Sequence, residues 1–239
     1  FPAVHYSNPI FSHFAGQDRI EFGSTRTDTG WLYRHLVEQH GGDVSKLSPY
    51  EAIAVSGSVP RSLAGRLVLP NISPNMKFSI PLSQAAQRKQ YLENLNALVT
   101  GSGSNSMLDR VASQLKAAMG AQGDLEHLDG EPSKAELARY PDTEFGKKML
   151  TVSRLIRMNL GTKVFALSGG GWDTHLLQGA GGGSHSLRLR QYADAMAAFM
   201  KDMGETAMAN TLIVTMTEFG RSVKFAGTGT DHGNASAWF

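Results

Sequence analysis

The stretch from Lys163 to Gly233 constrains this chain most, because short apolar runs alternate there with glycine-rich loops and one long helical pattern. Its first run, Lys163–Ser168, is apolar and β-prone, which predicts a buried strand. An apolar stripe at helical spacing follows, made of Tyr192, Met196, Phe199 and Met203. It predicts a crossover helix. The apolar run Thr211–Met216 predicts the next strand, and a connection of this length makes the two strands parallel with a right-handed crossover.

Acidic and imidazole side chains follow both predicted strands. Asp173 and His175 come after the first strand, and Glu218 comes directly after the second. Asp231 and His232 follow in the next glycine-framed motif, Gly229–Gly233. Because the carboxyl ends of parallel strands face one edge of a sheet, we expect these five side chains to converge there. Each pair alone is typical of an ordinary surface loop, but the combination favours a metal or catalytic cluster.

Composition limits the classes of protein that fit the chain. At 239 residues with 41% hydrophobic residues, it can bury one sizeable α/β core. The net charge of +2 comes from 23 basic and 21 acidic residues spread along the chain, which argues against a nucleic-acid partner. No segment approaches the roughly 18 consecutive apolar residues of a membrane span. Cysteine is absent, so any metal site must use oxygen and imidazole ligands.

The first part of the chain predicts further elements of the same α/β core. A strand-like run opens the chain at Phe1–Tyr6, and Ser12 is placed as the N-cap of a following helix. A short helix is expected over Gly30–Val37, and Ala52–Ser56 is apolar enough for another buried strand. Residues 83–140 are helical in pattern and predict a helical insert.

A third helix is expected from Phe145 to Leu160, closed by Gly161. Nucleotide sites and a serine-elbow site are disfavoured, because the chain has neither a P-loop nor a G-x-S-x-G motif. Arg221 lies next to the expected cluster, where it either binds an anionic group or pairs with Glu218 or Asp194.

Three motifs carry a resemblance to a known family: G-W-D-T-H at Gly171–His175, T-E-F-G-R at Thr217–Arg221 and G-T-D-H-G at Gly229–Gly233. In this order and spacing they resemble the exported bacterial proteins of domain-of-unknown-function family 1501 (DUF1501). The likeness extends upstream to Ser12–Phe14 and Gly30–Leu32, so it covers nearly the whole chain. That family resembles the alkaline phosphatase and sulfatase superfamily, which implies a mostly parallel central sheet with helices on both faces, a three-layer sandwich.

The resemblance also implies roles for individual residues. Ser12 stands where the superfamily has a hydroxyl nucleophile at a helix start. Asp173, His175 and His232 resemble metal ligands of the superfamily. Many relatives have S-D-H-G where this chain has Thr217–Gly220, so Glu218 can replace the acid but Phe219 cannot replace the imidazole.

We therefore expect a metal-dependent hydrolase of phosphate or sulfate esters, with Ser12 or a metal-bound water as the nucleophile. The candidate catalytic residues are Ser12, His13 and Arg221. The candidate metal ligands are Asp173, His175, Glu218, Asp231 and His232. Zinc or manganese suits this mixture of oxygen and nitrogen ligands, and calcium or magnesium is the alternative.

Two other functions stay open: a metal-independent esterase that uses Ser12, and an exported binding protein without turnover. The substrate is expected to be a small-molecule or glycan ester, and the location periplasmic or secreted, as the family resemblance implies. Residues 1–239 are expected to form a single domain that lacks flanking sequence at both ends, including a strand with one more acidic ligand before Phe1. The oligomeric state is left open.

Overall fold

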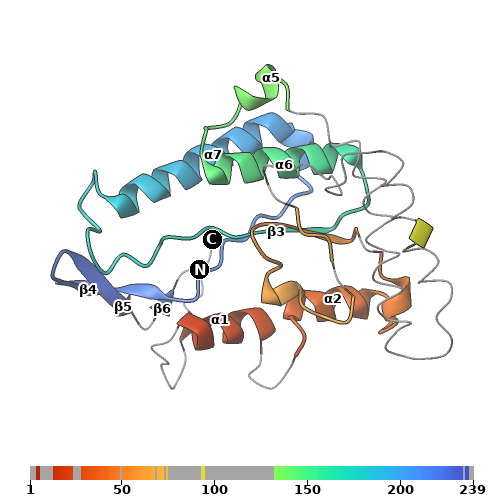
Figure 1. Ribbon diagram of the computed structural model, residues 1–239, viewed down its shortest axis with the longest axis horizontal. Helices are drawn as coiled ribbons and strands as arrows, with labels where there is room; N and C mark the ends of the chain where they lie inside the picture. Colours follow the sequence, from red (N-terminus) through yellow and green to blue (C-terminus); the bar gives the residue numbers. More distant parts are fainter. Residues whose placement is uncertain are drawn as a thin grey trace.

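The protein has a mixed α/β fold, as expected from its sequence (Figure 1). The computed structural model describes residues 4–5, 13–23, 28–48, 50–67, 69–72, 74, 93–94, 132–233 and 235–236. Within this part, no helix is both long enough and apolar enough to cross a membrane. Most of the expected helical insert at 83–140 lies outside the described residues, apart from α5 (Lys134–Leu137) near its end.

Two parallel strands, β2 (Ala52–Val55) and β3 (Val164–Leu167), form the centre of the fold. They are paired in register from Ala52 opposite Val164 to Val55 opposite Leu167. Every residue of β2 is buried, as a run of alanine and β-branched residues predicts for a strand covered on both faces. Both strands were expected from the sequence, but the predicted parallel partner of Lys163–Ser168 was Thr211–Met216, whereas the structure pairs β3 with β2.

Helices cover both faces of this strand pair. Alternate side chains of a strand point to opposite faces, so each face has apolar side chains that a helix can bury. Ile53 and Val55 contribute to one core cluster with residues of α6 (Glu144–Met158) and α7 (Ser184–Met208). Ala52 contributes to a second cluster on the other face, with Tyr33 and Leu36. Figure 1 shows α6 and α7 on one side of the strands and α1 (His13–Phe22) and α2 (Trp31–Gln39) on the other.

Local sequence signals account for the ends of these helices. Thr143 caps α6, where its side chain accepts a hydrogen bond from the backbone N–H of Gly146. Asn159 ends the same helix in the left-handed conformation, with φ of 53°. After α2, Gly41 and Gly42 have φ of 66° and 83°, which a glycine adopts without strain. The predicted helices over Gly30–Val37, 145–160 and the crossover segment are confirmed within a few residues.

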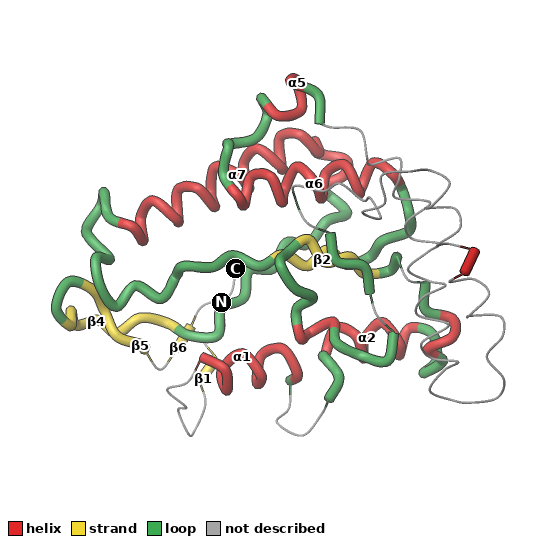
Figure 2. The backbone as a smooth tube through the Cα atoms, viewed as in Figure 1, coloured by secondary structure: helices red, strands yellow, loops and turns green. Residues whose placement is uncertain are grey.

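The predicted strand at Thr211–Met216 is wrong, because this segment forms no strand in the structure (Figure 2). Its side chains still alternate, since Leu212 is 87% exposed and Val214 54% exposed while Ile213 packs against the core. No neighbouring strand of the described chain pairs with it. An apolar alternating run becomes a strand only when a neighbour supplies the ladder of hydrogen bonds.

Residues 220–233, which were expected to be loops, form an antiparallel hairpin. It comprises β4 (Gly220–Ala226) and β5 (Gly229–Gly233), joined at Gly227 and Thr228. Gly227 has a φ of 68°, and the tight two-residue hairpin turns need a positive φ at this first central position. The register shifts between Arg221 and Phe225, so the hairpin lacks the even alternation by which a sequence reveals a strand.

In the opening run, the described residues form the strand β1 (Val4–His5), which pairs antiparallel with β6 (Ala235–Ser236). Each sheet among the described residues has two strands. The mixed α/β class is therefore confirmed, whereas a larger, mostly parallel sheet in a three-layer sandwich stays a prediction.

Candidate metal centre

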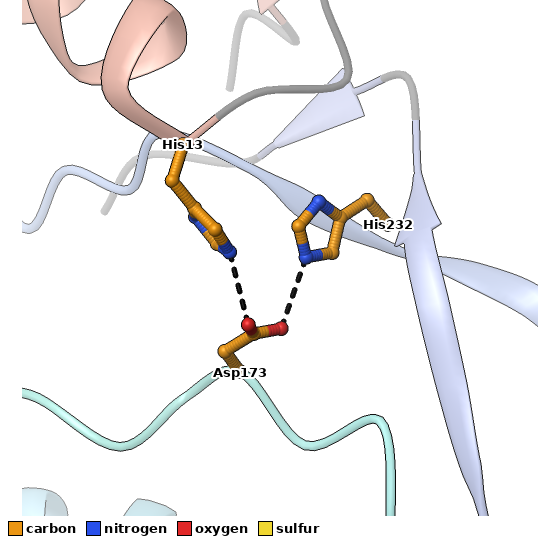
Figure 3. A group of neighbouring side chains, drawn as sticks. All are labelled: His13, Asp173 and His232. Carbon is orange, nitrogen blue, oxygen red and sulfur yellow. Dashed lines mark hydrogen bonds and ion pairs between the residues drawn. The ribbon is translucent and has the colours of Figure 1, made fainter.

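Three segments far apart in the sequence meet at the carboxylate of Asp173, in the loop that follows β3 (Figure 3). His13 comes from the first turn of α1, and its Nε2 lies 3.1 Å from Asp173 Oδ2. His232 comes from β5, and its Nε2 lies 2.9 Å from Asp173 Oδ1. Figure 3 shows both imidazoles directed toward this carboxylate. Each of the three residues offers a ligand atom, and these atoms lie within 4.8 Å of one another.

A third imidazole lies at the same carboxylate. His175 Nε2 is 2.8 Å from Asp173 Oδ1 and 3.0 Å from His232 Nε2. The rings of His175 and His232 have centroids 4.7 Å apart. Asp173 Oδ1 is therefore surrounded by two imidazole nitrogens, and Oδ2 faces a third.

The loop after β3 is bound directly to the hairpin. The backbone N–H of Thr230 donates to the carbonyl of Thr174 at 3.4 Å, and Leu177 N–H donates to Thr228 Oγ1 at 3.0 Å. Gly229 makes the close approach possible, because a Cβ there would collide with the backbone carbonyls of Thr174 and His175. This contact fixes the distance between the loop and β5, which carry Asp173 and His232.

A small buried network supports the loop from beneath. Thr174 and Thr230 are 7% and 5% exposed. Both hydroxyls reach Gln178 Oε1, at 3.3 Å from Thr174 and 2.6 Å from Thr230. Because Thr174 points inward, its neighbours Asp173 and His175 project together on the outer side, as the D-x-H spacing predicted.

Helix α1 is positioned by its contact with the segment before β4. Gly16 packs against Glu218, where an added Cβ would come within 3.0 Å of the Glu218 carbonyl oxygen. Glu218 Oε1 lies 3.1 Å from His13 Nδ1. The His13 ring meets the Phe219 ring edge-on, with centroids 4.5 Å apart. Helix α1 thus brings the imidazole of His13 into contact with both Glu218 and Phe219.

The buried Nε2 of His13 has no hydrogen-bond partner among the described residues. A carboxylate only accepts hydrogen bonds, so the contact with Glu218 places the imidazole hydrogen on Nδ1. Nε2 then presents a lone pair toward Asp173 Oδ2, 3.1 Å away. Two acceptors at this distance repel each other unless a cation, a proton or a metal ion, lies between them. These residues therefore fit a metal ion.

Asp173 is held in its charged form. Burial alone would raise its pKa, but its close contacts with His232, His13 and Arg221 outweigh burial and lower the pKa to about 2. The carboxylate is therefore ionised across the physiological range of pH. An anionic oxygen surrounded by imidazoles is the donor chemistry that zinc and similar ions use in proteins.

Arg221 connects the parts of the site. Its Nη2 donates to Asp173 Oδ1 at 2.9 Å and to the carbonyl of Trp172 at 2.7 Å, and its Nη1 donates to the carbonyl of Thr230 at 2.8 Å. The guanidinium also lies over the Phe219 ring, 4.8 Å from the centroid. Of the two alternatives left open for Arg221, pairing with Glu218 or Asp194 is not observed, since the arginine pairs with Asp173.

The structure brings most of the expected site residues together. Asp173, His175 and His232 are in direct contact, and Arg221 contacts the same carboxylate. Glu218 contacts His13, and Asp231, 70% exposed, lies at the rim beside His175. Ser12 lies outside the described residues.

Sequence reasoning missed that His13 is a candidate ligand. His13 was expected to be a catalytic residue beside Ser12 and was not placed among the ligands, because it shares no motif with Asp173 or His232. The packing of Gly16 against Glu218 places it at the site, and a single glycine in a helix is too weak a signal to predict that contact.

Comparison with known proteins gives one match. A family model with the description "Protein of unknown function (DUF1501)" matches residues 9–239. No curated protein and no solved structure matches the chain.

Proposed function

This chain belongs to the DUF1501 family, and we propose that it is a metal-dependent hydrolase of phosphate or sulfate esters. The observation that supports this function best is the buried Nε2 of His13, which lacks a hydrogen-bond partner among the described residues and faces Asp173 Oδ2. Nε2 of His232 is directed at the other oxygen of the same carboxylate. Such a set suits a divalent ion of the zinc or manganese kind.

A divalent ion held there would supply Lewis-acid activation of an ester oxygen or of water. The ion and Arg221 would each attract an anionic group of the substrate. Arg221 adds a fixed positive charge beside Asp173. Neutral imidazoles carry no charge, so they do not compensate the charge of the metal ion. This applies to three side chains of the site, His13, His175 and His232. Ser12 directly precedes α1 and would act as the nucleophile in this proposal.

The family resemblance supports further details of this proposal. In it, the β2–β3 pair is part of a mostly parallel sheet in an alkaline phosphatase-like three-layer sandwich. The protein acts in the periplasm or outside the cell, on a small-molecule or glycan ester. The parallel pairing of β2 with β3 and the helices packed on both of their faces agree with this architecture.

The experiment is metal analysis of the purified full chain, followed by assays on aryl phosphate and aryl sulfate monoesters. We expect about one zinc or manganese ion per chain, loss of turnover in chelator and recovery when the metal is restored. Asp173→Asn and His232→Ala should each lose metal and activity. His35→Ala is the matched control, because His35 lies in α2 and contacts Gln39 instead of the site.

The contact between Glu218 and His13 also supports a second candidate, a metal-independent esterase. A histidine oriented by a carboxylate is the base that activates a serine in that class. Turnover that survives chelation would favour this esterase over the metal-dependent hydrolase. A bound metal without turnover on any ester would instead indicate a binding protein.

A further inference from the structure

Two of the three imidazoles at Asp173 share one arrangement: Nε2 faces the site, and Nδ1 faces a carboxylate on the outer side. His13 Nδ1 lies 3.1 Å from Glu218 Oε1, and its Nε2 faces Asp173. His175 Nδ1 lies 3.4 Å from Asp231 Oδ1, and its Nε2 lies 2.8 Å from Asp173 Oδ1. The pattern therefore occurs twice, on segments far apart in the sequence.

We propose that Glu218 and Asp231 are positioning residues that orient His13 and His175 as metal ligands, and that neither carboxylate binds the ion. The donor set is Nε2 of the three histidines together with the carboxylate of Asp173. This inference rests on the proposed function only in that the site takes a divalent ion. It reassigns Glu218 and Asp231, which the sequence placed among the ligands, and gives His13 a role as a ligand.

The physical reason is the tautomer of each imidazole. A neutral imidazole carries its hydrogen on one nitrogen and its lone pair on the other, and a carboxylate accepts the hydrogen. Glu218 therefore holds the hydrogen of His13 on Nδ1 and leaves Nε2 free to bind a cation. A metal-binding histidine commonly donates its other N–H to a carboxylate, which fixes the ring and makes the ligand more basic.

The two carboxylates should not contribute equally. Glu218 is 34% exposed and lies 3.1 Å from its histidine, whereas Asp231 is 70% exposed and lies 3.4 Å away. Water screens the more exposed pair more strongly. Asp231 Oδ1 also accepts a hydrogen bond from the backbone N–H of His232 at 2.9 Å, which fixes its place in β5. Glu218 should therefore have the larger effect on metal affinity.

The donor set also defines the class of ion. Three imidazole nitrogens and one carboxylate suit zinc and neighbouring transition ions, whereas calcium and magnesium need mainly oxygen ligands. If Glu218 and Asp231 were ligands, carboxylate oxygens would be as numerous as imidazoles, and the harder ions would compete better. Metal preference therefore separates the two assignments.

The test uses the metal-stripped full chain and needs no substrate. Zinc affinity is measured by competition with a chromophoric chelator, and the visible absorption of bound cobalt(II) reports the ligand set. We expect Glu218→Ala to weaken zinc binding about 10- to 100-fold. Glu218→Gln should lose less, because its amide oxygen still accepts from Nδ1. Asp231→Asn should have the smallest effect, and the cobalt spectrum should keep its shape in all three variants.

Glu205→Gln is the matched control, because Glu205 is an exposed residue of α7. Thermal melting of the metal-free variants separates misfolding from loss of affinity. Unchanged zinc affinity in Glu218→Ala would overturn the inference. A cobalt spectrum that changes shape in this variant would also overturn it, because a changed shape would show that a ligand had been lost. Tighter binding of calcium or magnesium than of zinc would overturn the donor set.

The results also distinguish this inference from the proposed function. If zinc binding depends on Glu218 and no ester is hydrolysed, the inference stands and the hydrolase proposal fails. If esters are hydrolysed only when metal is bound, and zinc affinity does not depend on Glu218, the hydrolase proposal stands and the inference fails. A chain that binds no divalent ion would refute both.

Discussion

Arg221 and His232 lie directly opposite each other across the β4–β5 hairpin, and both side chains reach Asp173 Oδ1, at 2.9 Å each. One hairpin pair thus presents an imidazole and a guanidinium to the same carboxylate oxygen. The imidazole fits a metal ligand, whereas the guanidinium holds the loop and the hairpin together. The site is therefore built from the contact between these two segments as well as from the side chains themselves.

Arg221→Lys should lower the free energy of unfolding by about 1–3 kcal/mol, because lysine cannot reproduce the fork of a guanidinium. Arg221 donates to the carbonyls of Trp172 and Thr230 as well as to Asp173, and its side chain is 14% exposed. Urea unfolding measures the loss. Arg190→Lys, at an exposed position of α7, should change stability little, and equal stability of the two variants would contradict this role of Arg221.

Gly229→Ala should destabilise the protein by about 1–3 kcal/mol, as overpacking does elsewhere. The new methyl group would collide with the carbonyls of Thr174 and His175, so the loop and the hairpin must separate. We expect weaker zinc binding in the same variant, since Asp173 and His232 lie on the two separated segments.

Gly181→Ala is the control for this change. A Cβ at Gly181 meets no atom within 4 Å, so its thermal melting temperature should stay near that of the original protein. If Gly229→Ala behaves like Gly181→Ala, the contact between loop and hairpin does not determine the site.

The elements predictable from the sequence are those whose signal is local. The strands β2 and β3 follow from short apolar runs, and the helices α2, α6 and α7 follow from periodicity and caps. Thr211–Met216 carries the same signal as a strand, but pairing depends on a neighbour that the run itself does not specify. The hairpin was missed because its register shift removes the alternation.

The same division holds for the site. Asp173, His175 and His232 were predictable, because they follow apolar runs in motifs with glycine. The contact of Glu218 with His13 was not, since it depends on the packing of α1 against a segment 205 positions away. Sequence reasoning could thus predict the cluster of side chains around Asp173 while assigning Glu218 and His13 to different roles.

Ser12→Ala should abolish turnover of a phosphate monoester if this hydroxyl is the nucleophile of the proposed hydrolase. The sequence predicts Ser12 as the N-cap of α1, and loss of such a serine costs only about 1 kcal/mol, so folding should survive. Ser133→Ala is the matched control: Ser133 caps α5 by accepting a hydrogen bond from the backbone N–H of Glu136. Steady-state kinetics on both variants decide, and full activity of Ser12→Ala would assign the attack to water.

Asp202 on α7 is a buried carboxylate away from Asp173 that should make stability depend on pH. Its side chain is 3% exposed and contacts Arg139 at 2.5 Å and Arg157 at 3.0 Å. The Tyr140 hydroxyl donates to it at 2.8 Å. Burial would raise the pKa of Asp202, but hydrogen bonds from Arg139, Tyr140 and Arg157 outweigh burial and lower it from 3.8 to about 2.

A lowered pKa in the folded state contributes stability above the unfolded pKa, and this contribution is lost as the pH falls toward 2. For a shift from 3.8 to about 2, the contribution is about 2 kcal/mol. Asp202→Asn lacks it, so the variant should be less stable by about that amount at pH 6, and the difference should shrink between pH 4 and pH 2. Asp194→Asn, at an exposed position on the same helix, should show neither effect. Urea unfolding at several pH values measures the difference, and a gap that stays constant down to pH 2.5 would show that Asp202 acts through packing and not through its charge.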